Sequence, residues 1–210
     1  MIKTFSSFCA VAFAAICLGA TSCATHPASD LLEVKKVIPN VVLDIRYATT
    51  NNFTGQKLYD GDRTFLRKET AKKLAAAQRE FNAQGLGLKI YDAYRPLSVQ
   101  RKMWAVYPHP GYVADPARGS RHNRGAAVDV TLIHLDTGKE LPMPSHYDEF
   151  SERAHRDYTG ASAEETRNRE LLERVMQKNG FKGLPTEWWH FDDVDSRKYG
   201  LLDIDSSQIK

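Results

Sequence analysis

Strand-like and helix-like segments follow one another along this chain without a regular strand–helix–strand alternation. Residues 68–84 place apolar side chains at helical spacing and end at Gly85, which is typical of a helix closed by a glycine. A second long helix is expected to begin with a capping box at Ser162 and Glu165 and to run to about Asn179. This irregular mixture predicts an α+β fold, with a mostly antiparallel sheet and flanking helices.

The expected strands lie before, between and after these helices. Residues 37–47 are rich in β-branched side chains, residues 86–93 are apolar, and residues 126–132 alternate between apolar and polar. A hairpin-type turn is expected at residues 136–139 and a shorter helix at residues 98–106. The intervening stretch, rich in proline and glycine, is expected to be a loop.

The start of the chain does not resemble part of a folded domain. Lys3 is followed by apolar and small residues over 8–20, which is typical of a secretory signal peptide and short for a membrane span. Residues 20–23 resemble a loose lipoprotein box that would lipidate Cys23, and simple cleavage near Ala24 is the alternative. We therefore expect export to the periplasm or cell envelope, with a lipid on Cys23 as the only link to the membrane. The expected organisation is a leader at 1–24, a tether at 25–30 and one domain at 31–210.

Composition argues against cysteine chemistry in the domain and against a nucleic-acid partner. All three cysteines (Cys9, Cys17 and Cys23) lie in the leader, so we expect no disulfide, no cysteine metal ligand and no cysteine nucleophile in the domain. The formal net charge is +3, and Lys and Arg are scattered among Asp and Glu without a basic stripe. A nucleic-acid partner is therefore not expected.

Two short segments carry residue types that point to chemistry. His122 and Asp129 belong to one of them, and Glu187 and His190 belong to the other. Two imidazoles and one carboxylate can hold a zinc ion and leave a fourth position open for water. A second carboxylate beside that water can act as a base. Together the four side chains are what a metallopeptidase needs.

Each segment alone also has an ordinary explanation. His122 and Asp129 fit a surface histidine and a capping aspartate, although the small residues 125–127 permit a tight turn that would bring the two together. Glu187 and His190 fit an aromatic core strand with incidental polar groups. Residues i and i+3 face opposite sides of a regular strand, so a bulge or a strand end is expected there. Because the combined set of ligands suits zinc, we favour the metal site.

Arg95 directly follows the expected strand at 86–93 and precedes Pro96, which restricts it to an extended conformation. An arginine held in a cleft can stabilise a tetrahedral oxyanion. An ordinary ion pair with Asp92 is the alternative.

With these residues in view, the chain resembles the zinc D-alanyl-D-alanine dipeptidases, the peptidase family of the VanX-type enzymes. The resemblance implies the compact α+β fold of the hedgehog and zinc D,D-peptidases. It also implies one zinc ion per chain, with His122, Asp129 and His190 as ligands. The matching stretches follow the family's order over nearly the whole mature chain and are residues 46–55, 94–96, 120–132, 136–138, 143–152 and 187–190.

The resemblance further implies roles for five residues. Glu187 is the implied catalytic base and Arg95 the implied stabiliser of the transition state. Tyr47 and Asp148 match positions that hold the substrate's free ammonium, and Ser120 matches a serine beside the ligand histidine. The implied reaction is hydrolysis of D-alanyl-D-alanine to two D-alanines in cell-wall dipeptide metabolism.

A carboxylate such as Asp148 would favour a dipeptide with a free α-ammonium and reject an N-acylated one, which would leave the charge unpaired. Trp188 and Trp189 are available to line a tight pocket. One alternative is a D,D- or L,D-carboxypeptidase or endopeptidase acting on longer muropeptides, which would not need Asp148. The other is a non-catalytic envelope protein with a structural zinc, which would need neither Glu187 nor Arg95.

Overall fold

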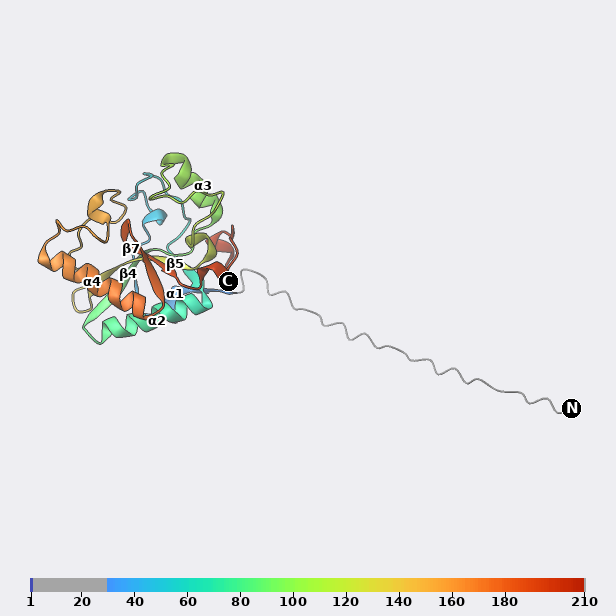
Figure 1. Ribbon diagram of the computed structural model, residues 1–210, viewed down its shortest axis with the longest axis horizontal. Coiled ribbons are helices and arrows are strands. Elements are labelled where there is room, and N and C mark those ends of the chain that lie inside the picture. Colours follow the sequence, from blue (N-terminus) through green and yellow to red (C-terminus); the bar gives the residue numbers. More distant parts are fainter. Residues whose placement is uncertain (2–29, 210) are drawn as a thin grey trace.

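The structure is a computed structural model that describes Met1 and residues 30–209 (Figure 1). The expected leader and nearly all of the expected tether lie outside the described residues and stay predictions. Within the described part of the chain, no helix combines the length and the apolar character needed to cross a bilayer.

A five-stranded sheet runs through the centre of the domain in the order β2-β4-β5-β7-β6 (Figure 1). Only the β2–β4 pair is parallel, and the other pairs are antiparallel. A separate antiparallel pair joins β1 to β3. The α+β architecture with a mostly antiparallel sheet is confirmed. The strands are β1 (Leu31–Glu33), β2 (Val42–Leu43), β3 (Phe65–Arg67), β4 (Leu86–Asp92), β5 (Ala127–His134), β6 (Phe181–Leu184) and β7 (Glu187–Asp193).

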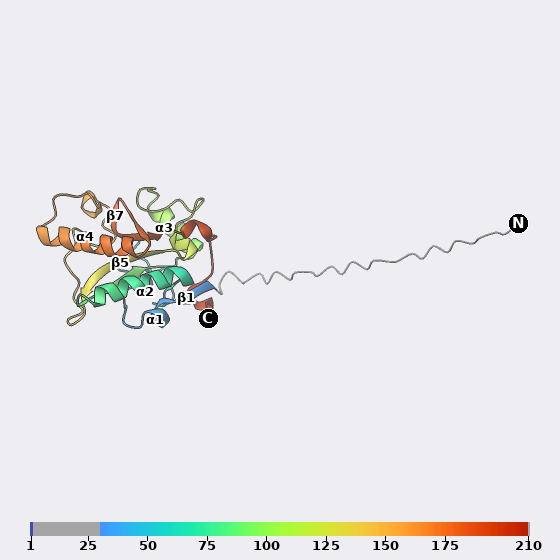
Figure 2. The same cartoon turned by 60° about the horizontal axis from the view of Figure 1, so that its bottom comes forward.

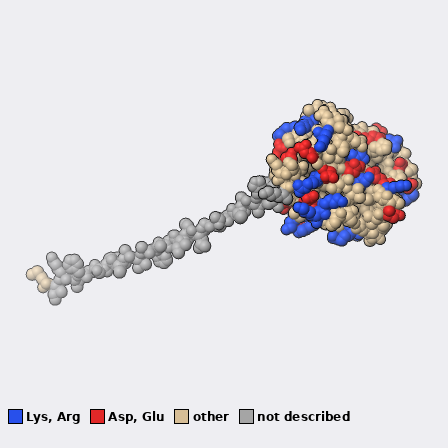
Figure 3. Space-filling view, turned by 180° about the vertical axis from the view of Figure 1, so that it is seen from behind, with Lys and Arg blue, Asp and Glu red and all other residues tan. Residues whose placement is uncertain are grey.

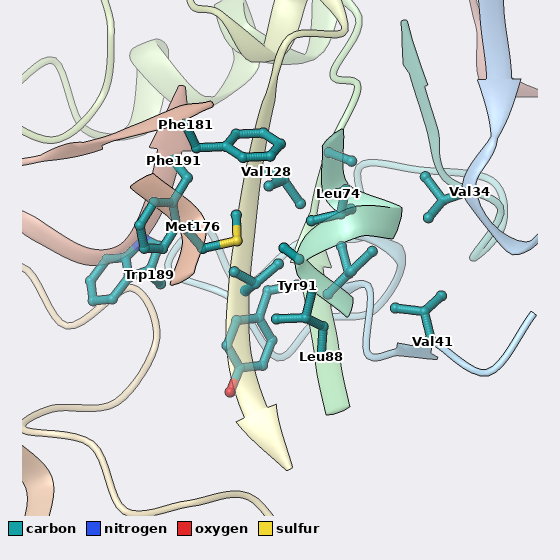
Figure 4. Packing of buried hydrophobic residues seen from close by; sticks show 14 of the residues in the cluster. Val34, Val41, Leu74, Leu88, Tyr91, Val128, Met176, Phe181, Trp189 and Phe191 are labelled. Atoms are coloured by element: carbon teal, nitrogen blue, oxygen red, sulfur yellow. The ribbon is translucent and has the colours of Figure 1, made fainter. Parts of the chain in front are cut away.

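The two long helices, α2 (Lys68–Asn82) and α4 (Ala163–Lys178), contact each other and pack on one face of the sheet (Figure 2). Alternation along β5 explains this packing. Val128 and its apolar neighbours at every second position join the core beneath the helices, together with Leu74 and Met176 (Figure 4). Asp129, one position along, faces the other side of the sheet, where the functional site lies.

Most expected elements are confirmed near their expected bounds. Gly85 follows the end of α2 with a φ of 74°, and α4 begins with the expected capping box between Ser162 and Glu165. The short helix is α3 (Leu97–Val106), and a further helix, α1 (Val34–Val37), was not expected. On the face seen in Figure 3, basic and acidic side chains are interspersed.

The expected strand at 37–47 is wrong over most of its length. Only β2 is extended and paired, while Arg46–Ala48 forms a 3-10 turn. Pro39 lies in a turn directly after α1 and has no N–H to donate to a strand ladder. The alternation at Ile45 and Tyr47 arises because both side chains are buried, not because they belong to a strand.

Candidate active site

His122, Asp129 and His190 converge, with one potential ligand atom from each lying within 4.8 Å of the others. His190 Nδ1 lies 3.0 Å from Asp129 Oδ1 and 3.1 Å from His122 Nε2. The third edge, from His122 Nε2 to Asp129 Oδ1, is 3.3 Å. A tetrahedral zinc site with bonds of roughly 2.0–2.2 Å has ligand–ligand edges of about 3.3 Å. The three donor atoms therefore fit a zinc ion.

Local backbone geometry explains this convergence. Asp129 and His190 are direct partners across the β5–β7 ladder. His122 sits in a 3-10 turn, His122–Arg124, which ends at Gly125 in the left-handed conformation and leads directly into β5. This is the tight turn that the small residues 125–127 led us to expect.

Gly125 offers a test of this turn. Its φ is +67°, and an added Cβ would lie 2.7 Å from a methyl carbon of Leu31. Gly138 has a φ of +66°, but nothing lies within 4 Å of its added Cβ. Both alanine variants carry the cost of a left-handed residue, and Gly125→Ala adds overpacking of about 1–3 kcal/mol. Thermal unfolding should therefore show a lower Tm for Gly125→Ala than for Gly138→Ala, and equal values would contradict this packing.

Neighbouring groups fix the orientation of the three converging side chains. His122 Nδ1 lies 2.6 Å from the carbonyl oxygen of Ala93, and His190 Nε2 lies 2.9 Å from Asp192 Oδ1. Because both oxygens accept hydrogen bonds, these contacts favour the tautomers with a proton on His122 Nδ1 and His190 Nε2. The other ring nitrogens are then unprotonated and face Asp129. Tyr147 donates to Asp129 Oδ2 at 3.0 Å, while Oδ1 faces His190 and His122 at 3.0 Å and 3.3 Å.

Glu187 is the first residue of β7 and lines the same pocket as His190. A bulge or a strand end was expected here, because residues three apart on a regular strand face opposite sides. The β6–β7 register slips here, because Gly183 pairs with Phe191 while Leu184 pairs with Glu187. Both expected features are therefore present: Glu187 is at the strand end, and the ladder beside it is irregular. A β-bulge is a common way to re-aim a side chain at an active site.

Three carboxyl groups share this pocket and titrate differently. Burial, with the added charge of Asp129, raises the pKa of Glu187 to about 8 and that of Asp148 to about 8. Burial also acts to raise the pKa of Asp129, but His122 and His190 hold it well below its usual range. A bound cation or a substrate ammonium would favour the ionised forms of Glu187 and Asp148.

Arg95 lines the pocket and is held from three sides. Its Nε and Nη2 donate to Asp92 Oδ2 at 2.9 Å and 2.6 Å, and its Nη1 donates to Gln100 at 2.8 Å. The guanidinium lies 5.2 Å from the ring centre of Tyr47. Arg95 thus forms the ion pair with Asp92 and also lines the pocket. The bonds to Asp92 and Gln100 use three of the five N–H donors of Arg95 and fix its guanidinium beside the pocket.

Asp148 and Tyr47 meet on one wall of the pocket, where the Tyr47 hydroxyl donates to Asp148 Oδ2 at 2.9 Å. Asp148 has a φ of 59°, a positive value that no other non-glycine residue shows in the described part of the chain. A positive φ strains the backbone of a non-glycine residue, and such residues cluster at functional sites. The two residues are therefore placed to bind one ligand group together.

The remaining expected residues are divided between the pocket and its surroundings. Ser120 lines the pocket, and its hydroxyl accepts the backbone N–H of His122 at 3.2 Å. Trp189 lines the pocket, but Trp188 does not. The Nε1 of Trp188 donates to Ser145 at 2.9 Å, and both residues line a different pocket. The expectation that both tryptophans line the pocket was therefore wrong for Trp188.

Sequence reasoning missed three residues that support the site. Asp192 follows His190 by two positions on one strand, a spacing that would have revealed a shared face. Asp92 appeared only as an ordinary ion-pair partner, yet it also accepts from Tyr59 at 2.8 Å. For Tyr147 the sequence offers no signal, because its bond to Asp129 joins a distant loop to β5.

The pocket is small. Its cavity measures about 170 Å³, below the roughly 300–1,000 Å³ of sites for drug-sized ligands. Phe53, Tyr112 and Phe150, from three separate loops, form an aromatic rim in which Phe150 lies 5.2 Å from Phe53 and 4.9 Å from Tyr112 between ring centres. A cavity of this size, with cationic and anionic walls, suits a short zwitterionic ligand.

Comparisons with known proteins agree with this geometry. The family model described as D-ala-D-ala dipeptidase matches residues 27–205. A D-alanyl-D-alanine dipeptidase of Escherichia coli (strain K12) is 37% identical over 174 residues, covering 83% of this chain and 90% of that protein. Enzymes of the same name from Enterococcus faecium and Enterococcus faecalis (strain ATCC 700802 / V583) are 35% and 34% identical. They cover 74% and 78% of this chain, and the alignments span 87% and 91% of those proteins. The chain belongs to the D-Ala-D-Ala dipeptidase family of peptidases.

Proposed function

We propose that this protein is a zinc-dependent dipeptidase that hydrolyses D-alanyl-D-alanine to two D-alanines in cell-wall metabolism. The observation that carries the proposal is the convergence of the buried side chains of His122, Asp129 and His190 beside Glu187 in one small pocket. His122 Nε2, Asp129 Oδ1 and His190 Nδ1 are the proposed ligands of one zinc ion per chain. Family membership supports both the chemistry and the substrate.

A zinc ion held by His122, Asp129 and His190 would supply Lewis-acid chemistry, which polarises a scissile carbonyl and makes water more acidic. Glu187 accepts a proton from the attacking water and passes it to the departing amine. The guanidinium of Arg95, which lines the pocket, would donate to the oxyanion as it develops. Asp92 and Gln100 hold the guanidinium in place, so that little reorganisation is needed in the transition state.

Specificity for a free dipeptide would come from Asp148 and Tyr47. Their hydrogen-bonded pair would receive the substrate's α-ammonium, and the aromatic rim would leave little room for a longer chain. Ser120 is proposed to line the substrate site while its hydroxyl steadies the backbone of His122. An N-acylated peptide would bury the Asp148 carboxylate without a cationic partner, which is costly.

The direct test is hydrolysis of D-alanyl-D-alanine and of N-acetyl-D-alanyl-D-alanine, each with and without a chelator. Cleavage of the free dipeptide alone, abolished by the chelator, is the expected result. Preferential cleavage of the blocked peptide would assign the protein to the carboxypeptidases instead. Turnover of neither substrate by zinc-loaded protein would support a non-catalytic zinc protein.

Asp148→Asn should weaken the use of the free dipeptide far more than that of the blocked one. Losing a charge-assisted hydrogen bond of about 1.5–3 kcal/mol corresponds to a fall of roughly 10–150-fold in kcat/KM. Steady-state kinetics with both substrates measures this change. Asp136→Asn, in an exposed turn, is the matched control. An unchanged ratio between the two substrates would remove Asp148 from ammonium recognition.

We also propose export, with residues 1–24 as a leader and a lipid on Cys23 or cleavage near Ala24 as the two routes. The charge and apolar pattern of the leader supports this proposal. Mass spectrometry of the mature protein from its host distinguishes the two routes, because only the first leaves a lipidated Cys23. A full-length, unprocessed chain would contradict both.

A further inference from the structure

The pairing register of the β6–β7 hairpin shifts between two consecutive residues of β6. Gly183 pairs with Phe191, while the next residue, Leu184, pairs with Glu187. Residues 188–190 of β7 therefore have no counterparts on β6. In such a bulge the backbone carbonyls lose the donors that a regular strand would supply, and buried carbonyls need other partners.

Arg156 supplies those donors from a loop that precedes α4. Its Nε donates to the carbonyl of Leu184 at 2.9 Å, and its Nη2 donates to the carbonyls of Trp188 at 3.0 Å and His190 at 2.8 Å. The guanidinium also lies 4.4 Å from the ring centre of Phe191. One side chain therefore joins both edges of the irregular ladder.

Three neighbouring residues fix the position of Arg156. Its own backbone N–H donates to the carbonyl of Pro185 in the hairpin turn at 2.9 Å. Glu173 of α4 lies 3.5 Å from Nη1 and balances the charge. Gly183 provides the space, since an added Cβ would lie 2.3 Å from both Cζ and Nε of Arg156.

We propose that Arg156 is a positioning residue of the active site. It holds the bulge that turns Glu187 and His190, three positions apart on one strand, toward the same pocket. Without the guanidinium, the carbonyls of Trp188 and His190 would lack these donors, and the strand would relax toward a regular pairing. A regular strand places residues i and i+3 on opposite faces. The inference rests on the proposed roles of Glu187 and His190.

The test compares Arg156→Lys and Arg156→Met with the wild type at a temperature well below every Tm. An ammonium replaces at most part of the three-carbonyl contact, so the lysine variant should lie between the other two. Disturbing groups that orient metal ligands typically costs about 10–100-fold in metal affinity or activity. We expect a fall of that size in kcat and in zinc affinity measured against a competing chelator, with a smaller change in KM.

Two further variants separate positioning from stability. Gly183→Ala keeps the charge of Arg156 but displaces the guanidinium, and should reproduce the kinetic and metal-binding defects. Gly87→Ala is its control in β4, because the added Cβ would meet the exposed side chain of Leu135 at 2.8 Å. Gln78→Leu removes a buried bond to the backbone of Leu88 away from the site, so it should lower the Tm and leave kcat and zinc affinity unchanged.

The absorption spectrum of the cobalt(II)-substituted protein gives a readout that is independent of turnover, because it reports the geometry of the ligands. A shifted spectrum in the Arg156 and Gly183 variants, with the wild-type spectrum in both controls, supports the proposal. Wild-type spectra and zinc affinities in all Arg156 variants would overturn it, whatever their Tm. If the wild type binds zinc but does not cleave the dipeptide, the proposed function fails while these two measurements still decide the role of Arg156.

Discussion

Glu187→Gln is expected to lower kcat for D-alanyl-D-alanine by about 10²–10⁴-fold while the protein still binds one zinc ion. Glutamine keeps the size of the side chain but cannot accept and return the proton. Glu187 is absent from the three-residue cluster that fits a metal, so its replacement should leave the ligands in place. Steady-state kinetics and metal analysis of the same preparation measure both quantities.

The pH profile sharpens this test. Burial raises the pKa of Glu187 to about 8 in the protein alone, and a bound cation shifts that pKa downward. The base must be ionised, so kcat/KM should fall as the pH drops through the pKa of Glu187 in the metal-loaded protein. The part of this acid limb that comes from Glu187 should be missing from the residual activity of Glu187→Gln. Glu140→Gln, a change of an exposed glutamate, is the control and should keep the full profile. Loss of zinc from Glu187→Gln would mean that Glu187 is a ligand rather than the base.

Removing the metal is expected to have the second large effect, on both activity and stability. Chelation, or His190→Ala, should abolish hydrolysis, because a metal site that loses one of three protein ligands binds zinc weakly. A ligand present at about 1,000 times its Kd stabilises the folded state by about 4 kcal/mol. The wild type should therefore show a clear rise in Tm when zinc is restored, and His190→Ala should show little. Full activity after exhaustive chelation would contradict a zinc mechanism.

The pH dependence of zinc binding has a definite sign. Burial acts to lower the pKa of His190, but hydrogen bonds with Asp129 and Asp192 outweigh it and raise the pKa to about 10. A proton on Nδ1 competes with the metal, so the apparent zinc affinity should decrease as the pH falls from 8 to 6. In the metal-free protein, the stabilisation from this raised pKa is complete below the unfolded-state value near ~6.5 and is lost as the pH rises through about 10. Zinc titrations and thermal unfolding across this pH range measure both trends.

Local patterns were sufficient for elements that depend on neighbouring residues. The capping box at Ser162 and Glu165 located the start of α4. Gly85, which has a positive φ, located the end of α2. The strand at 37–47 failed because alternating apolar residues indicate burial, and a 3-10 turn buries Ile45 and Tyr47 as well as a strand would. The three metal-binding candidates were recognisable because their residue types, not their spacing, carry the chemistry.

Residue types and local patterns were enough to predict the α+β class, the long helices and the four side chains expected at the metal site. How those side chains meet depends on the complete fold, because the pairing of Asp129 with His190 joins two strands that are far apart in the chain. The tertiary structure also revealed the supporting contacts of Tyr147, Asp192 and Arg156, since each bond depends on where a loop or strand lies in space. The type of a residue gives its chemistry, but its orientation depends on packing and hydrogen bonds that form only in the complete fold.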